Sequence, residues 1–355
     1  MSTDQISEEK AEAFAERVFT AMDGASLMLL MSVGHQTGLF DKLAELPAST
    51  SEDIAAAAGL QERYVREWLG GMAVSDVVEY DAAEKTYRLP PEHAATLTRA
   101  AGPDNLAFFS QYVALLAGVE AKVVKVFKEG GGVPYSAFER FQEVQREETA
   151  RVYDVALVEA ILPLADGLID SLQEGIDVLD VGTGAGHAIN VMAKAFPNSR
   201  FTGADMSEEG VALGTSEAKA WGLANASFKV EDAAETSGQW DLITAFDTIH
   251  DQARPTKTLA AIHHSLRPGG VFLMGDISFS SNLEENIGNL FAPSIFAFSV
   301  FHCMTVSLAQ DGEALGTAWG TQRAVEKLEE GGFREVDVKQ VEGDFLNNYY
   351  ITRKA

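Results

Sequence analysis

A histidine–aspartate pair, His250-Asp251, stands shortly after the apolar run WDLITAF, which is typical of a buried strand. The ordinary pKa of a histidine side chain is about 6.5, so a neutral His250 can accept a proton from a hydroxyl group near neutral pH. Asp251, or another carboxylate, is expected to fix the tautomer of the ring. This chemistry makes His250 and Asp251 a candidate catalytic pair, with a structural histidine at a strand end as the alternative.

A glycine-rich turn precedes this pair along the chain, in the run VLDVGTGAGH. Because Gly182, Gly184 and Gly186 lack side chains, the backbone there can approach a ligand closely and the next helix can pack on the strand. The dinucleotide-binding pattern G-x-G-x-x-G would need a glycine at position 187, which is His187. The observed spacing, G-x-G-x-G, therefore argues against a dinucleotide site.

Acidic residues follow two further strand-like runs. Asp205 ends RFTGAD, where a carboxylate can accept hydrogen bonds from both hydroxyls of a ribose. Asp232 follows ASFKVE, where a carboxylate can accept a hydrogen bond from an adenine amino group. Each acid taken alone is equally compatible with a loop residue or a helix cap. Because ligands of open α/β sheets bind beyond the carboxyl ends of the strands, we expect both acids, the glycine turn and His250 to share one edge.

The elements that must position these residues alternate between strands and helices after Gly175. Strand-like runs such as IDVLDVG and GGVFLMGDIS are separated by helix-like runs such as GHAINVMAKAF and PTKTLAAIHHSL. This alternation predicts βαβ units, and hence an α/β domain with a mostly parallel, Rossmann-like sheet covered on both faces. We assign residues 156–355 to this domain.

Residues 1–155 are predicted to form a separate, helical domain. Apolar residues recur with helical spacing over residues 7–42, with interruptions expected at Gly34 and Gly38. Helix, turn, helix and hairpin then follow, which is the order of elements in a winged helix. The second of these helices and the hairpin mix acids with bases, so they form no basic stripe for DNA phosphates. This favours a dimerisation or lid domain over DNA binding.

A long segment, residues 277–319, is inserted near the end of the sheet domain. A structureless loop of that length is rare inside a compact domain, so we expect helices that cap the active site. Their aromatic residues suggest an apolar wall for a substrate, with ordinary core packing as the alternative. His302 is a second candidate base, whereas Cys303 is expected to be a small buried residue. The predicted substrate residues are Phe291, Phe296, Phe298, Phe301 and His302.

The composition limits the class of protein. The 355 residues carry 27 basic and 53 acidic side chains, and this net charge of −26 disfavours binding to nucleic acid or to anionic membranes. A single cysteine excludes a disulfide framework and a multi-cysteine zinc site, and no His, Asp and Glu cluster has metal-ligand spacing. The sequence shows neither a signal-peptide pattern nor an apolar run of roughly 18 residues. We therefore expect a cytoplasmic protein without a bound metal.

In these features the chain resembles the class I S-adenosylmethionine-dependent methyltransferases. The matching runs are DVGTGAG, the acid after the second strand, ED-A after the third, LRPGG before the fifth, and REVDVKQV with NNYYITRK, which resemble the closing antiparallel hairpin. With the winged helix, the layout is similar to that of small-molecule O-methyltransferases, which commonly dimerise through the first part. The resemblance implies S-adenosyl-L-methionine as cofactor, contacted by Asp180, Gly182, Gly184, Gly186, Asp205, Met206, Asp232, Ala233, Phe246 and Asp247.

O-Methyltransferases of this kind carry a His-Asp-Trp motif after the fourth strand, and its histidine is the general base. The pair His250-Asp251 matches the motif, whereas Gln252 stands at the tryptophan position. We therefore predict a homodimeric methyltransferase that O-methylates a small, partly apolar acceptor, with His250 as the base. Two alternatives stay open: a winged-helix DNA-binding regulator with the cofactor pocket as a sensor, and a non-methylating enzyme of the same fold.

Overall fold

The computed structural model describes residues 6–344 and 346–355, so the first five residues of the N-terminal sequence searched for a signal peptide lie outside it. The chain divides into two compact units, Met1–Ala117 and Gly118–Ala355. This division lies N-terminal to the one predicted at residue 155. The difference arises because helix α8 (Phe141–Ala156) packs against helix α10 (His187–Ala195) of the sheet domain.

The first unit has the element order of a winged helix. Its third helix begins where the Thr50 hydroxyl accepts a hydrogen bond from the backbone N–H of Asp53, and it ends at Gly59 in the left-handed conformation. The elements of this unit are α1 (Glu8–Gln36), α2 (Leu39–Glu45), α3 (Ser51–Ala58), α4 (Glu62–Val74), β1 (Glu79–Asp81), β2 (Thr86–Arg88), α5 (Pro91–Leu97) and α6 (Ser110–Ala117), with short 3₁₀ turns at Arg99–Asp104 and Leu106–Phe109.

Helix α1 continues through Gly34, where the sequence predicted an interruption, and this prediction is wrong. A side chain at Gly34 would overlap the rings of Trp68 and Phe40, which pack directly on the helix backbone. The Trp68 indole N–H also donates a hydrogen bond of 2.7 Å to the carbonyl oxygen of Leu30. Gly34 therefore serves close packing between α1 and the winged-helix core, whereas Gly38, with φ +70°, does separate α1 from α2.

The N-terminal part of α1 is exposed along residues 8–26. Four large apolar side chains lie there, and each is between 51% and 65% exposed: Phe14, Val18, Phe19 and Met22. By length and composition α1 would also be able to cross a membrane, a test that core helices of soluble proteins pass as well. Its C-terminal part, which includes the buried Met31, belongs to the hydrophobic core of the winged helix.

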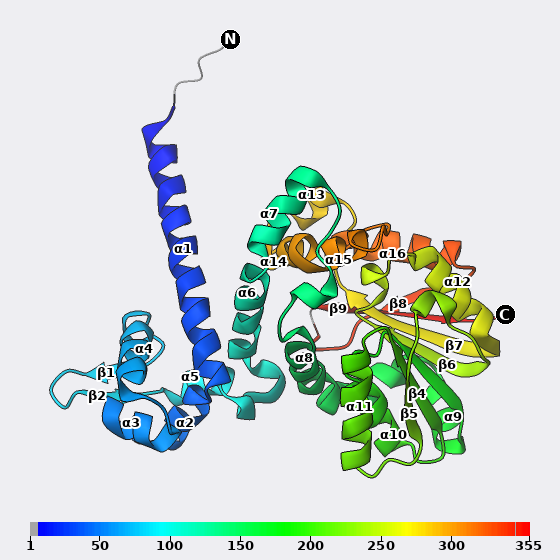
Figure 1. The fold of residues 1–355 in the computed structure, drawn as a ribbon, viewed down its shortest axis with the longest axis horizontal. Coiled ribbons are helices and arrows are strands. Elements are labelled where there is room, and N and C mark those ends of the chain that lie inside the picture. The colour runs from blue at the N-terminus through cyan, green and yellow to red at the C-terminus, as the bar shows by residue number, and fades with distance from the viewer. Residues whose placement is uncertain (1–5, 345) are drawn as a thin grey trace. The chain divides into compact units, whose positions relative to one another are not determined.

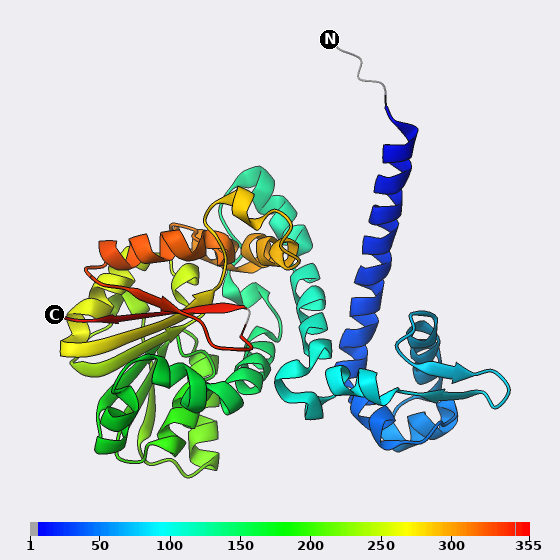
Figure 2. The ribbon, with the colours of Figure 1, turned by 180° about the vertical axis from the view of Figure 1, so that it is seen from behind.

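The second unit is built on a seven-stranded sheet with the order β5-β4-β3-β6-β7-β9-β8 (Figures 1 and 2). The first five of these strands are parallel, and β9 is antiparallel to both of its neighbours. The predicted fold class is thereby confirmed. The strands are β3 (Asp177–Val181), β4 (Arg200–Asp205), β5 (Ala226–Val230), β6 (Trp240–Phe246), β7 (Leu266–Ile277), β8 (Asp337–Lys339) and β9 (Asn347–Arg353).

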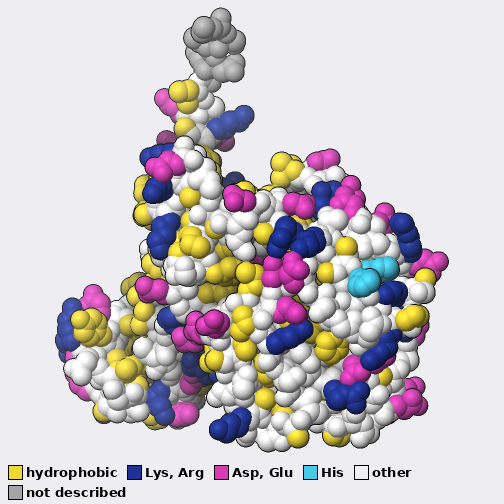
Figure 3. Space-filling model, turned by 45° about the vertical axis from the view of Figure 1, so that its right-hand side comes forward, with side chains coloured by type: hydrophobic (Ala, Val, Ile, Leu, Met, Phe, Trp, Pro, Cys, Tyr) yellow, Lys and Arg dark blue, Asp and Glu magenta, His cyan; other side chains and the backbone are white. Residues whose placement is uncertain are grey.

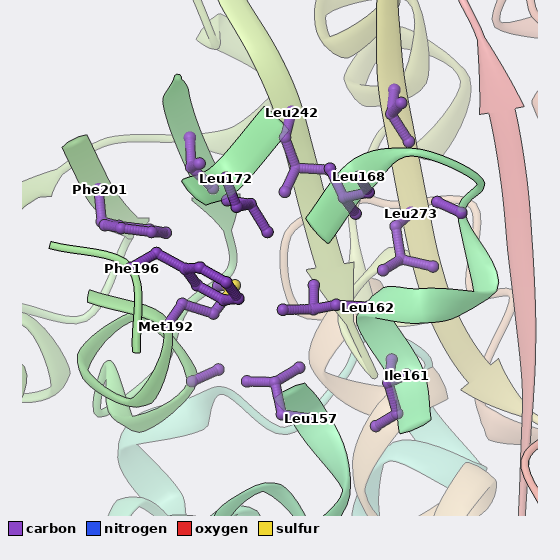
Figure 4. Close-up of a cluster of buried hydrophobic side chains, with 14 of the residues drawn as sticks. Leu157, Ile161, Leu162, Leu168, Leu172, Met192, Phe196, Phe201, Leu242 and Leu273 are labelled. Atoms are coloured by element: carbon purple, nitrogen blue, oxygen red, sulfur yellow. The ribbon is translucent and has the colours of Figure 1, made fainter. Parts of the chain in front are cut away.

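Side chains alternate between the two faces of the sheet, and each face has its own core. Val178 points into a cluster with helices α9 and α10, and Figure 4 shows part of this cluster. The next residue, Leu179, belongs to a second cluster with α12 and α16. Further helices of this unit are α7 (Glu120–Glu129), α9 (Leu168–Glu174), α11 (Glu208–Ala220), α12 (Pro255–Ser265) and α16 (Gly320–Glu330).

The inserted segment folds as helices between β7 and α16. Helix α14 runs through a π-helical turn, Ser299–Cys303, into α15, so these pieces form one irregular helix. π-helical turns are rare in proteins overall, and those that occur often lie at functional sites. The helical pieces are α13 (Leu283–Asn286), α14 (Ala292–Phe298), α15 (Met304–Leu308) and a 3₁₀ turn at Thr317–Trp319.

Truncation of Leu162, which is fully buried in the core of Figure 4, should destabilise the second unit. We expect Leu162→Ala to lower the free energy of unfolding by about 2–5 kcal/mol, because the lost side chain leaves a cavity. Urea unfolding followed by circular dichroism measures this change. Leu290→Ala, at a position that is 84% exposed, is the control and should change stability by less than about 0.5 kcal/mol. Equal midpoints for the two variants would contradict the packing described here.

Candidate active site

The predicted site residues follow the carboxyl ends of neighbouring strands. Strands β4, β3, β6 and β7 are parallel and adjacent, so their carboxyl ends lie at one edge of the sheet (Figure 1). The glycine turn follows β3, Asp205 ends β4, and Phe246 ends β6. The topology therefore brings to one edge the residues that sequence analysis expected there.

The glycine turn needs its glycines for conformation and for space. Gly182, Gly184 and Gly186 have φ angles of +68°, +53° and +74°, which side chains other than that of glycine rarely adopt. A Cβ atom at Gly182 would also overlap the side chain of Thr248, and one at Gly186 would overlap the ring of Phe228. The turn is thus pressed against the segment that follows β6, which carries His250.

Asp205 holds the glycine turn from the neighbouring strand. One of its carboxylate oxygens, Oδ2, accepts a hydrogen bond of 2.8 Å from the backbone N–H of Gly184, and Oδ1 accepts one of 2.7 Å from Ser207. Each carboxylate oxygen has a second lone pair, so both can still accept a hydrogen bond from a ligand. Burial raises the pKa of Asp205 above its ordinary value. The next residue, Met206, is 55% exposed.

Both carboxylate oxygens of Asp232 already have partners within the protein, which the sequence did not indicate. Its Oδ1 accepts a hydrogen bond of 2.9 Å from the N–H of Ala234 and so caps a short 3₁₀ turn that begins at Ala233. Its Oδ2 forms an ion pair of 2.7 Å with Arg254. The helix-cap alternative is therefore present in the structure, and a ligand contact of Asp232 would add to it.

Two further acids lie at this edge: Asp180 is buried, whereas Asp247 is half-buried and only its Oδ1 atom is out of contact with solvent. The Thr244 hydroxyl donates a hydrogen bond of 2.6 Å to Oδ1 of Asp180, and burial raises the pKa of Asp180 to about 6. Asp247 has a left-handed φ of +49°, and its Oδ1 has no hydrogen-bond partner among the described residues. Burial, and next the charge of Asp276, raise the pKa of Asp247 well above its ordinary value. A cationic ligand would favour the charged form of both acids.

The histidine of the pair, His250, is oriented by a carboxylate that sequence analysis did not identify. Its Nδ1 atom lies 2.8 Å and 3.0 Å from the two carboxylate oxygens of Asp276. Asp276 sits near the end of β7, next to β6, and also accepts a hydrogen bond of 3.0 Å from the indole N–H of Trp319. Because Nδ1 donates to Asp276, Nε2 is the acceptor atom of the neutral ring.

Asp251 lies on the other side of the same ring. Its Oδ1 is 3.4 Å from Nε2 of His250, which is within ion-pair distance but is not aligned as a hydrogen bond. Burial alone would lower the pKa of His250, but the charges of Asp276 and then Asp251 outweigh it and raise this pKa well above its ordinary value. His250 is therefore a stronger base than a free histidine, and its neutral form requires a higher pH.

A loop from before α8 closes over Asp251. The Tyr135 hydroxyl donates a hydrogen bond of 2.7 Å to Oδ2 of Asp251. The backbone N–H of Val133 donates one of 2.8 Å to the Thr305 hydroxyl, which ties this loop to the inserted helices. Gly132 makes the close approach possible, since a Cβ atom there would overlap the backbone around Thr305. Sequence analysis assigned none of these residues to the site.

His302 lies in an aromatic enclosure beside this group. Its ring stacks on Phe141 with 4.1 Å between centroids, and Phe138 and Tyr135 contact it edge-on at 4.6 Å and 5.3 Å. Its Nδ1 is 3.6 Å from the sulfur of Cys303. Burial lowers the pKa of His302 to about 4, so the ring is neutral at physiological pH and is a poor base.

The inserted segment contributes to the site through His302, while two of its predicted aromatic residues lie elsewhere. Phe291 and Phe296 remain 43% and 39% exposed, and Phe296 packs edge-on against Phe279. Phe298 and Phe301 are half-buried. The rings around His302 come from the loop and helix at residues 135–141. The three consecutive glycines before this loop are the feature of the sequence that could have indicated its place in the site, since glycines allow a close approach to other backbone.

Comparison with known proteins identifies the two parts of the chain. Residues 25–99 match a family model described as an Rv2258c-like winged helix-turn-helix domain, and residues 172–332 match one described as a methyltransferase domain. The chain therefore carries a methyltransferase domain and has the class I methyltransferase fold. No curated protein sequence matches it.

Solved structures agree with this methyltransferase fold over nearly the whole chain. A putative O-methyltransferase from Nostoc punctiforme is 15% identical, with a TM-score of 0.72, over 96% of this chain and 98% of that one. Mitomycin 7-O-methyltransferase is 17% identical, with a TM-score of 0.69, over 98% and 100%. Human N-acetylserotonin methyltransferase, solved with S-adenosylmethionine, is 18% identical, with a TM-score of 0.67, over both complete chains.

One cluster in this methyltransferase has the atoms of a metal site. His250, Asp251 and Cys303 each offer one ligand atom, and these atoms lie within 4.8 Å of one another. Burial raises the pKa of Cys303 to about 12, so its sulfur keeps a proton and is not the thiolate that metals bind. We assign no metal to this cluster.

Substitution of Asp276 should weaken the basicity of His250. In Asp276→Asn the charge that raises the pKa of His250 is lost, so we expect this pKa to fall toward or below about 6.5. A titration of the histidine ring signals by NMR measures it. Asp311→Asn replaces an exposed acid and is the control, with an unchanged His250 titration. An unchanged titration in Asp276→Asn would show that this carboxylate does not govern the ring.

Proposed function

We propose that this methyltransferase uses S-adenosyl-L-methionine to O-methylate a small, partly apolar acceptor in the cytoplasm, with His250 as the general base. The observation that carries the proposal is the buried hydrogen bond between His250 and Asp276, formed at the sheet edge that also holds the glycine turn. A buried, oriented imidazole next to a ligand-binding edge is suited to remove a proton from a bound hydroxyl group.

The residues at this edge fit the proposed cofactor. The backbone of the glycine turn leaves room where side chains would otherwise lie, and Asp205 keeps free lone pairs for ribose hydroxyls. The carboxyl groups of the buried Asp180 and the half-buried Asp247 suit a cationic sulfonium. When bound, the cofactor supplies a methyl group on that sulfonium. Structures with this fold include proteins solved with S-adenosylhomocysteine or S-adenosylmethionine, which supports the assignment.

The residues around His250 would act as follows. The acceptor hydroxyl donates its proton to Nε2 of His250, and the resulting imidazolium is stabilised by Asp276 at Nδ1 and by Asp251 at Nε2. The oxygen, freed of its proton, can then take the methyl group. His250, His302 and Cys303 are buried in the structure, so water is kept from the reacting oxygen. The remaining rate acceleration comes from the alignment of the two reactants.

Paired charges on the winged helix favour the enzyme over the DNA-binding alternative. On α4, Arg66 pairs with Glu62 at 3.3 Å and Arg63 pairs with Glu67. On the hairpin, Arg88 lies 3.7 Å from Glu79. Figure 3 likewise shows acidic side chains interspersed with basic ones over the face that it presents. Arginine side chains whose charge is neutralised by neighbouring acids bind the phosphate backbone of DNA only weakly.

Two substitutions should separate catalysis from cofactor binding. His250→Ala should lower kcat by about 100-fold or more and leave the cofactor dissociation constant unchanged, because only the proton transfer is lost. Asp205→Ala should instead weaken cofactor binding by about 5- to 150-fold, since charge-assisted hydrogen bonds to the ligand and the anchor of the glycine turn are removed. Calorimetry with S-adenosylmethionine and methyl-transfer kinetics measure the two effects, and each variant is the control for the other.

The pH profile of the wild type gives an independent check. Since the pKa of His250 is raised, kcat/KM should fall as the pH decreases through a value above about 6.5, and His250→Ala should lose this limb. Near-normal kcat in His250→Ala would return His250 to a structural role. Tight binding of a dinucleotide in place of S-adenosylmethionine would reject the cofactor assignment.

We further propose that two copies of the chain associate through α1. Its exposed apolar residues recur at Phe14, Val18 and Met22, which places them on one stripe of the helix. An apolar stripe of this length usually marks an interface, and in a two-fold dimer the same stripe can pack against itself. The second copy is therefore the proposed partner of this surface.

Charges within the α1 stripe should disrupt the dimer. The double variant Val18→Glu/Met22→Glu is expected to shift the mass measured by light scattering at micromolar concentration from two chains to one, because two buried charges per chain are costly at an interface. Val74→Glu, at an 85% exposed apolar residue of α4, is the control and should keep the dimer mass. A monomer mass for the unmodified protein would overturn the proposal.

A further inference from the structure

Two buried polar atoms beside His250 have no hydrogen-bond partner among the described residues. They are Oδ1 of Asp251 and Nε2 of His302, in side chains of residues that are 9% and 2% exposed. Buried polar groups are almost always paired with protein or ligand atoms, because an unpaired one costs free energy. The two atoms therefore indicate what a bound molecule must offer.

The two atoms belong to one small cluster. Cys303 connects them: its sulfur lies 3.6 Å from Nδ1 of His302, and it is within 4.8 Å of ligand atoms of Asp251 and His250. The π-helical turn at Ser299–Cys303 supplies both His302 and Cys303 to this cluster. A ligand that contacts His250 can thus reach Asp251 and His302 without being large.

The protonation states of the cluster assign a role to each atom. A carboxylate oxygen accepts hydrogen bonds, and Oδ2 of Asp251 already accepts one from the Tyr135 hydroxyl. Cys303 keeps its proton because burial raises the pKa of its thiol to about 12, so the S–H can donate to Nδ1 of His302. His302 is neutral, with a pKa lowered by burial to about 4. In that arrangement its Nε2 carries the hydrogen and needs an acceptor atom.

We propose that His302 is a specificity-determining residue, whose Nε2–H donates a hydrogen bond to a second oxygen of the acceptor molecule. The first oxygen is the hydroxyl that contacts Nε2 of His250, beside Asp251, and receives the methyl group. The second is a hydroxyl, ether or carbonyl oxygen near the first, and as part of the proposal we place it no more than two carbon atoms along the acceptor. The inference rests on the proposed O-methylation at His250.

The surroundings of His302 suit this role better than a role as base. Phe141 covers one face of the ring, and Phe138 and Tyr135 pack edge-on against it, so the orientation of the ring is fixed. A fixed donor in a dry enclosure discriminates strongly against a molecule that leaves it unpaired. Because the side chains around His302 are aromatic, we choose simple aromatic acceptors as probes.

The test compares simple phenols that differ in the second oxygen. The probes are catechol and resorcinol, with the second oxygen one and two carbons away, and hydroquinone and phenol, with it too distant or absent. For the wild type with S-adenosylmethionine, kcat/KM should be about 10- to 100-fold higher for the better of the first two than for phenol. His302→Phe keeps the stacking on Phe141 and removes the nitrogen, so this ratio should fall to within about threefold.

The change should appear in KM for catechol or resorcinol, because a hydrogen bond to the unreacting oxygen stabilises bound substrate and transition state alike. His264→Phe, at an exposed histidine of α12, is the matched control and should keep the wild-type ratio. Calorimetry with S-adenosylmethionine confirms that each variant still folds and binds the cofactor.

Two kinds of failure can be told apart. If S-adenosylmethionine binds and the phenols are methylated, but His302→Phe keeps the wild-type preference, the role of His302 is rejected and the proposed function stands. Binding of the cofactor without binding or methylation of any of the four phenols also rejects the inference about the acceptor. If S-adenosylmethionine itself does not bind to the wild type, the proposed function fails.

Discussion

The hydrogen bond between His250 and Asp276 is the interaction on which the site depends. A buried charged pair is tolerated only where its geometry is good and its remaining polar atoms are satisfied, and the structure meets this condition with several elements at once. The adjacent strands β6 and β7 bring the two residues together, and the Trp319 indole, at the end of the inserted segment, donates a further hydrogen bond to the carboxylate. The sheet and the inserted segment are therefore both needed to hold one imidazole in one orientation.

The glycine turn is likewise held by residues in or just after the two strands that neighbour β3. Asp205, from β4, binds the backbone of Gly184, and Thr248, after β6, occupies the space beside Gly182. The turn is thereby shaped before any ligand binds, so a ligand need not supply the free energy of ordering it. Since Thr248 is only two residues from His250, the cofactor edge and the candidate base are parts of one packed arrangement.

The sequence predicted the features that follow from sheet topology and missed those that depend on long-range packing. Alternating strands and helices bring strand ends to a common edge, so Asp205 and His250 could be assigned to it from their positions alone. Asp276 lies near the same edge, so the same reasoning from strand order could have assigned it to the site. Tyr135 could not be assigned in this way, because its contact with Asp251 spans 116 residues of sequence and depends on how one loop packs on the inserted helices. Gly34 was misjudged for the same reason, since only the fold reveals that Trp68 lies against it.

The electrostatics of the edge explain how one site can hold both a cation and a base. Asp180 is buried and Asp247 is half-buried, and desolvation is the main cause that raises the pKa of each, so their charged forms are disfavoured without a cation nearby. A sulfonium cation close to them would favour ionisation, and this attraction would end when the methyl group leaves and the sulfur becomes neutral. The imidazolium formed at His250 keeps its own two carboxylates, Asp251 and Asp276. Separate acids thus serve the two positive charges of the proposed reaction, and loss of one charge favours release of the spent cofactor without weakening the base.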